Sequence, residues 1–395
     1  MTASLRRGAC PSLPAPMLTG DGLLARLVPA EPLSPAQLAG LARLARTLGN
    51  GVVEVTARGK LQLRGLTSDT APRLPGGIAA LGIAVRPGLA VEFPALAGQA
   101  ADAVFDPRPL ARAIESGAAP FAPELAPKVS VVVDSGGALN LSALSADLAL
   151  TVGDEPGGVR LVLAGQPIGT IPETEAADMA VALLARLAMR GPAARMAELL
   201  RGELQIEPQE RAPAHSAEPV GLHPLREGGV ALGIALAFGH GEADALEQLA
   251  ARAEAAGVTS VEPAAGRALL LSALSADAVA RLREEAHALG FITNPADPRR
   301  AVFACAGRPA CGAATLETRP LALALAPLIR GRTLHVSGCS KGCAHPAPTA
   351  FAIVGLDEGA GIVVEGSARA TPARIVPVAE LRARMEAMLA EKAGT

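Results

Sequence analysis

The sequence predicts an α+β fold built from two tandem modules that are related by a pseudo-two-fold axis. Two observations predict this architecture. The order β-α-β-β-α-β is expected once near the amino terminus and again after residue 225, with matched elements but little residue identity. Each of these units is followed by an α/β segment. A chain of 395 residues is also too long for one ordinary hydrophobic core, so several domains are expected.

The first β-α-β-β-α-β unit is expected over residues 21–95, after an amino-terminal arm at 1–20. Ser34 followed by Pro35 is typical of a helix start, because serine caps the first backbone N–H groups and proline suits the first helical position. Leucines recur at helical spacing as far as Leu48, and Gly49 is expected to end the helix.

Apolar and polar residues alternate from Val52 to Arg64, which predicts one strand with a polar face. Arg58, Lys60 and Arg64 would then lie along that face, about 7 Å apart for every two residues. A short helix near 75–81 and a strand at 83–86 would complete the unit. The alternative interpretation of the basic row is an ordinary solvated strand face.

The second unit is expected over residues 221–295, after a proline- and glutamate-rich linker near 206–225. Its predicted helices are 242–256 and 276–289, the latter capped by Ser275. We expect the two α/β segments at 96–210 and 298–392. The first ends with a long helix at about 173–189, and the second ends with a helix from about Val378.

Composition excludes some classes of function. The net charge is −2 with 19% charged residues, which gives no bulk attraction for nucleic acid. No uncharged apolar run is long enough to suit a membrane span, so a cytoplasmic protein without membrane partners is expected. Trp and Tyr are both absent, so strong visible or near-ultraviolet absorbance would have to come from a cofactor.

Four of the five cysteines lie close together near the carboxyl terminus. Cys305 and Cys311 form a C-x5-C motif, and Cys339 and Cys343 form a C-x3-C motif further along the chain. Each iron of a cubane cluster takes one soft thiolate, and nearby glycines allow backbone N–H groups to approach the sulfides. The quartet therefore predicts a [4Fe–4S] site.

Three other interpretations of the quartet remain open. A structural zinc site would also take four cysteines, although such sites usually contain shorter C-x2-4-C motifs. Two disulfides would suit a secreted protein, which nothing in the sequence indicates. Buried thiols without a ligand are common in cores, but these four lie in glycine-rich loops.

With these motifs in view, the chain resembles the sulfite/nitrite reductase superfamily over nearly its whole length. The resemblance rests on the repeated ferredoxin-like halves, on Thr56-Ala-Arg58 with Leu61-Gln-Leu-Arg64, on Pro127-Lys128-Val129, and on the cysteine pattern. It implies that each module is a ferredoxin-like half-domain followed by a sulfite-reductase-type α/β domain. It also implies that the four cysteines hold a [4Fe–4S] cluster and that Cys343 bridges to the iron of a sirohaem, hence haem binding.

Within the superfamily the sequence is more similar to the precorrin-3B synthases of aerobic cobalamin biosynthesis. The grounds are Arg7-Gly-Ala-Cys10-Pro11, the run from Gly20 to Leu27, and the run from Gly338 to Pro346. This resemblance implies an oxygen-dependent monooxygenase that hydroxylates precorrin-3A at C20, with γ-lactone formation. It also implies a tetrapyrrole substrate, O2 and an external electron donor linked to NADH or ferredoxin as partners.

The alternative function is a sirohaem-dependent assimilatory sulfite or nitrite reductase, which cages its oxyanion with four cations. Two departures disfavour it. Ser130 stands where a second lysine is expected after Lys128, and 93–98 lacks the expected Arg-Asn pair. Each missing cation removes charge-assisted hydrogen bonds worth about 1.5–3 kcal/mol. A non-enzymatic electron carrier is a third possibility.

The resemblance implies that basic residues bind the carboxylates of the tetrapyrrole, and the candidates are Arg58, Lys60, Arg64, Lys128 and Arg308. A mononuclear non-haem iron would want two histidines and one carboxylate, but no such pattern stands out. His345, which closely follows Cys343, is the weak candidate for a catalytic role. Histidines in such settings more often have a structural role than a metal-binding one, and this applies to each histidine of the chain.

Overall fold

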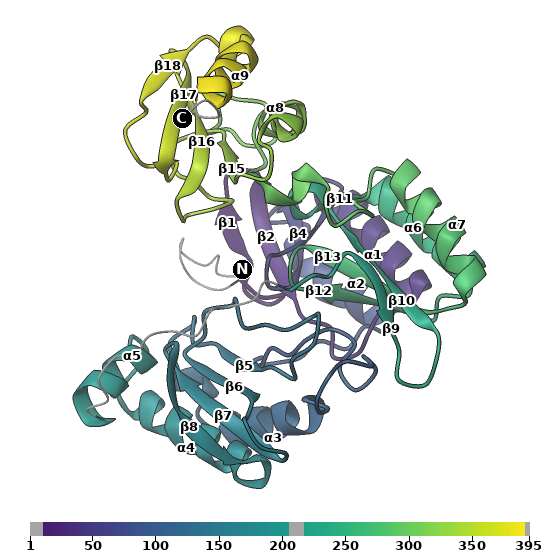
Figure 1. The fold of residues 1–395 in the computed structure, drawn as a ribbon, viewed down its shortest axis with the longest axis vertical. Helices are drawn as coiled ribbons and strands as arrows, with labels where there is room; N and C mark the ends of the chain where they lie inside the picture. The colour runs from purple at the N-terminus through teal and green to yellow at the C-terminus, as the bar shows by residue number, and fades with distance from the viewer. Residues whose placement is uncertain (1–10, 205–216, 392–395) are drawn as a thin grey trace.

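A computed structural model describes residues 11–204 and 217–391. Four β-sheets form three bodies in Figure 1: the paired ferredoxin-like units in the middle, the first α/β segment at the bottom and the cysteine-bearing segment at the top. The predicted α+β fold with two modules is confirmed. No helix in these two ranges is long and apolar enough to cross a membrane.

The first ferredoxin-like unit forms a five-stranded sheet in the order β1-β2-β4-β3-β11. Its strands and helices are β1 (Met17–Thr19), β2 (Gly22–Leu27), β3 (Val52–Val55), β4 (Leu61–Leu66), β11 (His240–Glu242), α1 (Pro35–Leu48) and α2 (Leu74–Ala80). The Ser34 side chain accepts the Gln37 N–H, and the Gln37 side chain accepts the Ser34 N–H, so the predicted cap of α1 is confirmed as a capping box.

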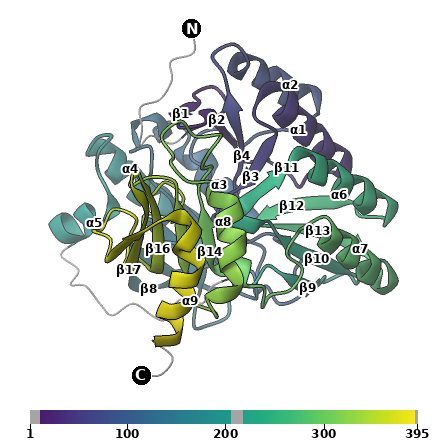
Figure 2. The ribbon, with the colours of Figure 1, turned by 90° about the horizontal axis from the view of Figure 1, so that it is seen from above.

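The second unit forms a four-stranded sheet in the order β12-β13-β10-β9. Its elements are β9 (Gly221–Pro224), β10 (Val230–Ala235), β12 (Ser260–Ala264), β13 (Ala268–Leu274), α6 (Ala243–Ala255) and α7 (Ala276–Ala288). Helices α1 and α6 pack side by side, as Figure 2 shows from above, and their buried leucines belong to one core that spans both units.

The two units exchange their edges. Strand β11 belongs to the second unit by sequence but pairs with β3 of the first, with Gly241 opposite Val53. In return Leu33, just before α1, pairs with Val261 of β12; the Leu33 N–H donates at 2.9 Å and the Val261 N–H at 2.6 Å. Each sheet is therefore completed by the segment that precedes the first helix of the other unit.

The two α/β segments also match. The first contains the sheet β5-β6-β7-β8, and its elements are β5 (Val131–Val133), β6 (Leu148–Val152), β7 (Gly158–Leu163), β8 (Gln166–Pro172), α3 (Arg108–Ala118), α4 (Glu173–Met189) and α5 (Met196–Leu199). The second contains the sheet β14-β15-β16-β17-β18, and its elements are β14 (Val302–Ala304), β15 (Leu334–Ser337), β16 (Thr349–Leu356), β17 (Gly359–Gly366), β18 (Arg374–Val376), α8 (Thr318–Leu325) and α9 (Leu381–Glu391).

Strand register fixes which residues correspond between these two segments. Phe303 of β14 pairs in parallel with His335 of β15, and Glu92 pairs in parallel with Val132 of β5. Glu92 and Phe303 therefore occupy matching positions, each on the chain that leaves a ferredoxin-like unit.

The structure corrects the predicted strand at 52–64. This segment is a hairpin of β3 and β4, with Val55 opposite Leu61. Gly59 has a φ of +73°, and the Thr56 N–H donates to the Lys60 carbonyl at 2.9 Å, so the chain reverses at 56–60. Polar and apolar residues alternate through the turn as well as through the strands, so the sequence pattern does not reveal the turn. Arg58 and Lys60 lie in or next to the turn and Arg64 lies on β4, so the three do not form one row.

Two smaller predictions also need correction. Strand β9 occupies 221–224, inside the expected linker, while residues 205–216 lie outside the described part of the chain. The strand predicted at 83–86 is reduced to one bridge between Val85 and Pro29. Cys10 also lies outside the described residues.

The shared core of the two units should carry much of the stability. Leu41 of α1 is fully buried in it, so Leu41→Ala should lower the free energy of unfolding by about 2–5 kcal/mol, through lost burial and a residual cavity. Leu323 of α8 is 46% exposed and provides the matched control, for which a small effect is expected. Denaturant titration of both variants checks this; equal losses would contradict a core that joins the two units.

Candidate functional site

The four cysteines lie in the two loops that follow β14 and β15. Because these strands are parallel neighbours, their carboxyl ends meet at one edge of the sheet, and the loops that carry the cysteines begin there. Cys305, Cys311 and Cys339 are half-buried, and Cys343 is exposed. The backbone thus brings together two motifs that are well separated in sequence.

Cys305 lies among backbone donors. Its Sγ accepts the Gly338 N–H at 3.3 Å, and the Gly307 N–H also bonds this thiol. Burial raises the pKa of the Cys305 thiol above its ordinary value, while these N–H groups act in the opposite direction. Gly307 has a φ of +63°, and a Cβ there would collide with Thr318, so the tight loop requires glycine.

Cys311 is covered by a part of the chain that is distant in sequence, near the amino terminus. The turn between β1 and β2 contacts it directly, because a Cβ on Gly20 would lie under 3.0 Å from Cys311 Sγ. The Gly312 N–H donates to the Gly20 carbonyl at 3.3 Å. The first module therefore contributes one side of the cysteine site.

These observations fit an iron–sulfur cluster. Four thiols from two adjacent loops are the donor set that such a cluster takes, and N–H groups directed at a cysteine sulfur are typical of its surroundings. In residues 11–204 and 217–391, no three His, Cys, Asp or Glu side chains already converge as a metal site. The two loops therefore supply the donor set, with Cys305 and Cys311 from one and Cys339 and Cys343 from the other.

A stack of side chains lies beside the cysteine loops. The Arg267 guanidinium lies 4.8 Å from the centroid of the Phe303 ring, and the ring of His345 stacks on Phe303 at 3.9 Å. Burial lowers the pKa of His345, and the charge of Arg267 lowers it further. His345 is therefore held against Phe303 as a neutral ring.

His335 lies beyond His345, with 6.1 Å between the ring centroids. It is fully buried, and burial lowers its pKa to about 4, with His345 adding to the effect. Neither ring nitrogen has a hydrogen-bond partner among the described residues. The two histidines are neighbours, but within the described ranges no carboxylate joins them as the third ligand of a mononuclear iron site.

Arg64 is held in a buried ionic network. Its Nε and Nη2 donate to the Asp21 carboxylate at 2.9 and 2.7 Å, and its Nη1 donates to Glu54 at 2.9 Å. Burial alone would raise the pKa of Asp21, but the hydrogen bonds and charge of Arg64 outweigh it, so this pKa is lowered. His240 of β11 lies 4.0 Å from Glu54 and borders the same network.

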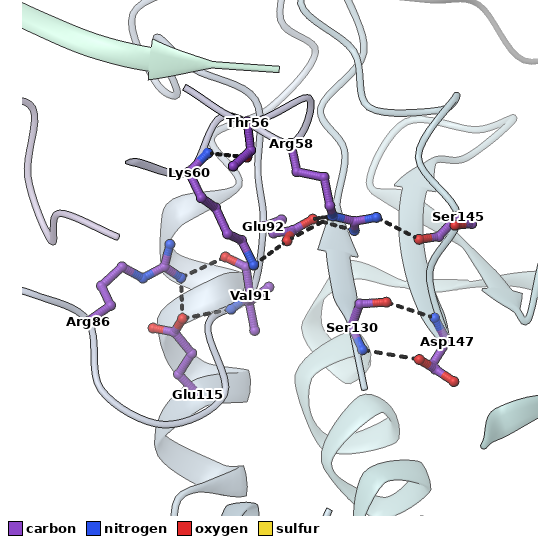
Figure 3. A network of polar contacts seen from close by, with 10 residues as sticks. All are labelled: Thr56, Arg58, Lys60, Arg86, Val91, Glu92, Glu115, Ser130, Ser145 and Asp147. Carbon is purple, nitrogen blue, oxygen red and sulfur yellow. Dashed lines mark hydrogen bonds and ion pairs between the residues drawn. The ribbon is translucent and has the colours of Figure 1, made fainter. Parts of the chain in front are cut away.

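Arg58 and Lys60 share one carboxylate, as Figure 3 shows. Arg58 Nε lies 2.8 Å from Glu92 Oε2, Lys60 Nζ lies 2.6 Å from Glu92 Oε1, and Arg58 Nη1 also donates to the Ser145 carbonyl at 2.9 Å. Burial would raise the pKa of Glu92, but Arg58 and Lys60 together lower it. Two cations against one carboxylate leave one net positive charge.

This triad lines a cavity of about 430 Å³ where the two ferredoxin-like units meet the first α/β segment. Five basic side chains line it: Arg58, Lys60, Arg86, Arg108 and Arg112. Four carboxyl groups also line it: Glu31, Glu92, Glu115 and Glu262. Burial raises the pKa of Glu262 to about 7, so near neutral pH the cavity carries a net positive charge.

The other basic candidates lie elsewhere. Lys128 is exposed ahead of β5, and Arg308 is exposed inside the first cysteine loop; neither lines the cavity. The cysteines do not line it either. The turn between β12 and β13 separates the two regions: Ala264 and Ala265 line the cavity, while Arg267 contacts Phe303 on the cysteine side.

Sequence reasoning missed several residues of these sites. Glu92, Glu262 and Arg267 stand in short apolar segments with no motif around them, and only the tertiary fold gives them partners. Asp21 could have been found, because a carboxylate between Gly20 and Gly22 in a turn has a conspicuous setting.

This chain is similar in sequence to known proteins, in one case over most of its length. Residues 19–81 match the nitrite/sulfite reductase ferredoxin-like half domain. A precorrin-3B synthase from Sinorhizobium sp. is 39% identical over 94% of this chain and 85% of its own length. Sulfite reductase [ferredoxin] 2 of Mycolicibacterium paratuberculosis is 28% identical over 43% of this chain and 33% of its own length.

Among solved structures, the NirA protein of Mycobacterium tuberculosis superposes with a TM-score of 0.68. The alignment covers 92% of this chain and 79% of that one, at 19% identity. At this identity the likeness establishes a shared fold and nothing about activity.

The ion pairs of Glu92 with Arg58 and Lys60 should make the free energy of unfolding depend on pH. Because the folded-state pKa of Glu92 lies below the unfolded one, its stabilisation is fully present above the ordinary carboxyl range and is lost as pH falls through the lowered pKa. Glu92→Gln should cost about 1–3 kcal/mol near neutral pH. The difference in unfolding free energy between wild type and variant should shrink toward acid pH in denaturant titrations; a constant difference would contradict the ion pairs.

Proposed function

The chain belongs to the precorrin-3B synthase family, and we propose that it hydroxylates precorrin-3A at C20, with γ-lactone formation, in an O2-dependent reaction. Family membership supports a role in cobalamin biosynthesis and an enzyme of the oxidoreductase type. The observation that carries the finer proposal is the pairing, on either side of one turn, of a cationic cavity with a four-cysteine site.

The proposed reaction balances as a monooxygenation. One atom of O2 forms the new C–O bond at C20 and the other leaves as water, so two electrons and two protons must be supplied. An external donor linked to NADH or ferredoxin is proposed as their source. Cys305, Cys311, Cys339 and Cys343 would hold a [4Fe–4S] cluster, which when bound supplies one-electron transfer.

The chain's own residues would bind and orient the substrate. A precorrin carries many acetate and propionate groups, and Arg58 and Lys60 provide a net positive charge on the cavity wall. Lys128 and Arg308 are exposed and would contact carboxylates outside the cavity. His345 is a candidate for contact with the reacting part of the substrate, since it stacks beside the cysteine loops.

Two features of the cavity region favour this proposal over a sulfite or nitrite reductase, which would use sirohaem. The chain at 93–98, where a reductase would present its Arg-Asn pair, lines the cavity with Phe93, Ala95 and Ala97. The side chain of Ser130, in place of the second lysine, bonds locally to the Asp147 N–H at 3.4 Å. Neither segment therefore supplies the cation that a reductase is expected to place there for its oxyanion.

The visible spectrum of protein purified without oxygen tests the proposal first. A cluster alone gives a broad shoulder near about 400 nm, whereas sirohaem adds sharp bands, including one in the red. We expect the shoulder alone, conversion of precorrin-3A to a hydroxylated lactone under O2, and loss of both in Cys343→Ser. Sirohaem bands together with sulfite-dependent oxidation of a reduced dye would support the reductase instead.

Arg58→Ala should weaken tetrapyrrole binding without bleaching the cluster, because Arg58 belongs to the cavity and not to the cysteine loops. Loss of charge-assisted bonds worth about 1.5–3 kcal/mol corresponds to about 10- to 150-fold weaker binding. Absorbance titration with precorrin-3A measures it. Arg46→Ala, which removes an exposed ion pair with Asp244, is the matched control. A colourless Arg58→Ala protein would contradict the placement of Arg58.

A further inference from the structure

We propose that the turn Thr19–Gly22 of the first module is a fixed wall of the cysteine site, and that Arg64 positions this wall through Asp21. The inference rests on the assignment of an iron–sulfur cluster to the four cysteines, but not on the reaction proposed above. It gives Arg64 a role different from the substrate contact that its sequence motif suggests.

The contact between the turn and the cysteine is steric. Gly20 approaches so closely that a single added methyl group would lie under 3.0 Å from Cys311 Sγ. The other neighbour of that methyl group is the Cβ of the same cysteine, at 3.5 Å, so relief requires the Cys311 side chain to rotate or the two loops to separate. The backbone bond from Gly312 to the Gly20 carbonyl joins the two loops beside this contact. Glycine at position 20 therefore leaves room for the Cys311 Sγ in its present position.

The turn is held from behind by the ionic network. The Asp21 side chain is almost fully buried and receives two hydrogen bonds from Arg64 in bidentate geometry. The Thr19 hydroxyl donates to the Gly22 carbonyl at 2.6 Å and lies 2.9 Å from Asp21 Oδ1. Gly22 adopts a φ of +110°, and a Cβ there would press on the Leu66 carbonyl. Side chains and backbone together fix the turn against β4.

The geometry of Arg64 suits positioning better than substrate binding. Its Nε, Nη1 and Nη2 all donate to carboxylates of this chain, and its side chain is only 15% exposed. A substrate carboxylate would have to displace Asp21 or Glu54, leaving a buried anion without its partner. Lys60, earlier in the same hairpin, faces the cavity instead. In this hairpin, Lys60 thus contributes charge to the cavity, whereas Arg64 holds the turn through Asp21.

Gly20→Ala tests the steric part. It should lower the iron and sulfide content per chain and the absorbance near about 400 nm to a small fraction of wild type, because Cys311 is displaced from the ligand set. Gly76→Ala is the matched control, since nothing lies within 4 Å of the added methyl group and its φ is not positive. Thermal unfolding is measured alongside. Wild-type iron content in a folded Gly20→Ala protein would overturn the proposal.

Asp21→Asn and Arg64→Met test the positioning part. Loosening the turn should weaken iron retention about 10- to 100-fold, the usual effect of losing a group that supports metal ligands. It should also speed the bleaching of the cluster in air. In the full chain before iron loading, alkylation of Cys311 should become faster while that of Cys339 stays unchanged. Mass spectrometry of the alkylated peptides separates the two thiols.

Arg195→Met is the matched control, because it removes a bidentate bond to Asp147 in the other α/β segment. It should lower stability without changing iron retention or Cys311 alkylation. If Arg195→Met lost iron to the same extent, the network would act only through general stability, and the positioning role would be wrong. Failure of wild-type protein to convert precorrin-3A would sink the proposed reaction while leaving this result intact.

Discussion

The exchange of edges between the two ferredoxin-like units is the constraint on which the rest of the structure depends. Strand β11 completes the sheet of the first unit, and the segment around Leu33 completes that of the second. Each sheet has an edge that pairs only with a segment of the other unit. This pairing matters because an unpaired edge exposes backbone N–H and C=O groups that need partners. The exchange also sets the two hairpin turns face to face, since Arg58 pairs with Ala265 and the Gly266 N–H donates to the Ala57 carbonyl at 3.0 Å.

The two turns carry the same geometry with different chemistry. Lys60 and Arg267 each follow a glycine with positive φ and directly precede the next strand. Each contacts the matching position on the chain that leaves its own ferredoxin-like unit: Lys60 forms an ion pair with Glu92, and Arg267 lies over the ring of Phe303. The duplicated framework thus places a cationic contact at the cavity in one half. In the other half it places an aromatic contact on β14, the strand before the first cysteine loop. At this pair of matched contacts, the difference comes from Glu92 in one half and Phe303 in the other.

Periodicity and caps predicted most of the frame, whereas the contacts of the site depended on tertiary structure. Ser34, Ser275 and the helix at 173–189 follow local rules, so the sequence predicts them closely. The hairpin at 56–60 was missed because polar and apolar residues alternate straight through it. The prediction of a cluster site at the cysteines rests on spacing alone, because each motif lies within one loop. Partners such as Glu92 and Asp21 lie far from Lys60 and Arg64 in sequence, beyond the reach of any local pattern.

The burial of Arg64 argues for a division of labour among cations that looked equivalent in sequence. A charge with several carboxylate partners and little exposure is costly to redirect, because each displaced anion would stay buried. Lys60 and Arg58 share a single carboxylate and border a cavity, so an incoming anion meets an excess of positive charge there. One hairpin can therefore serve both sides of the junction: its turn presents charge to the cavity, and its second strand holds the wall beside Cys311.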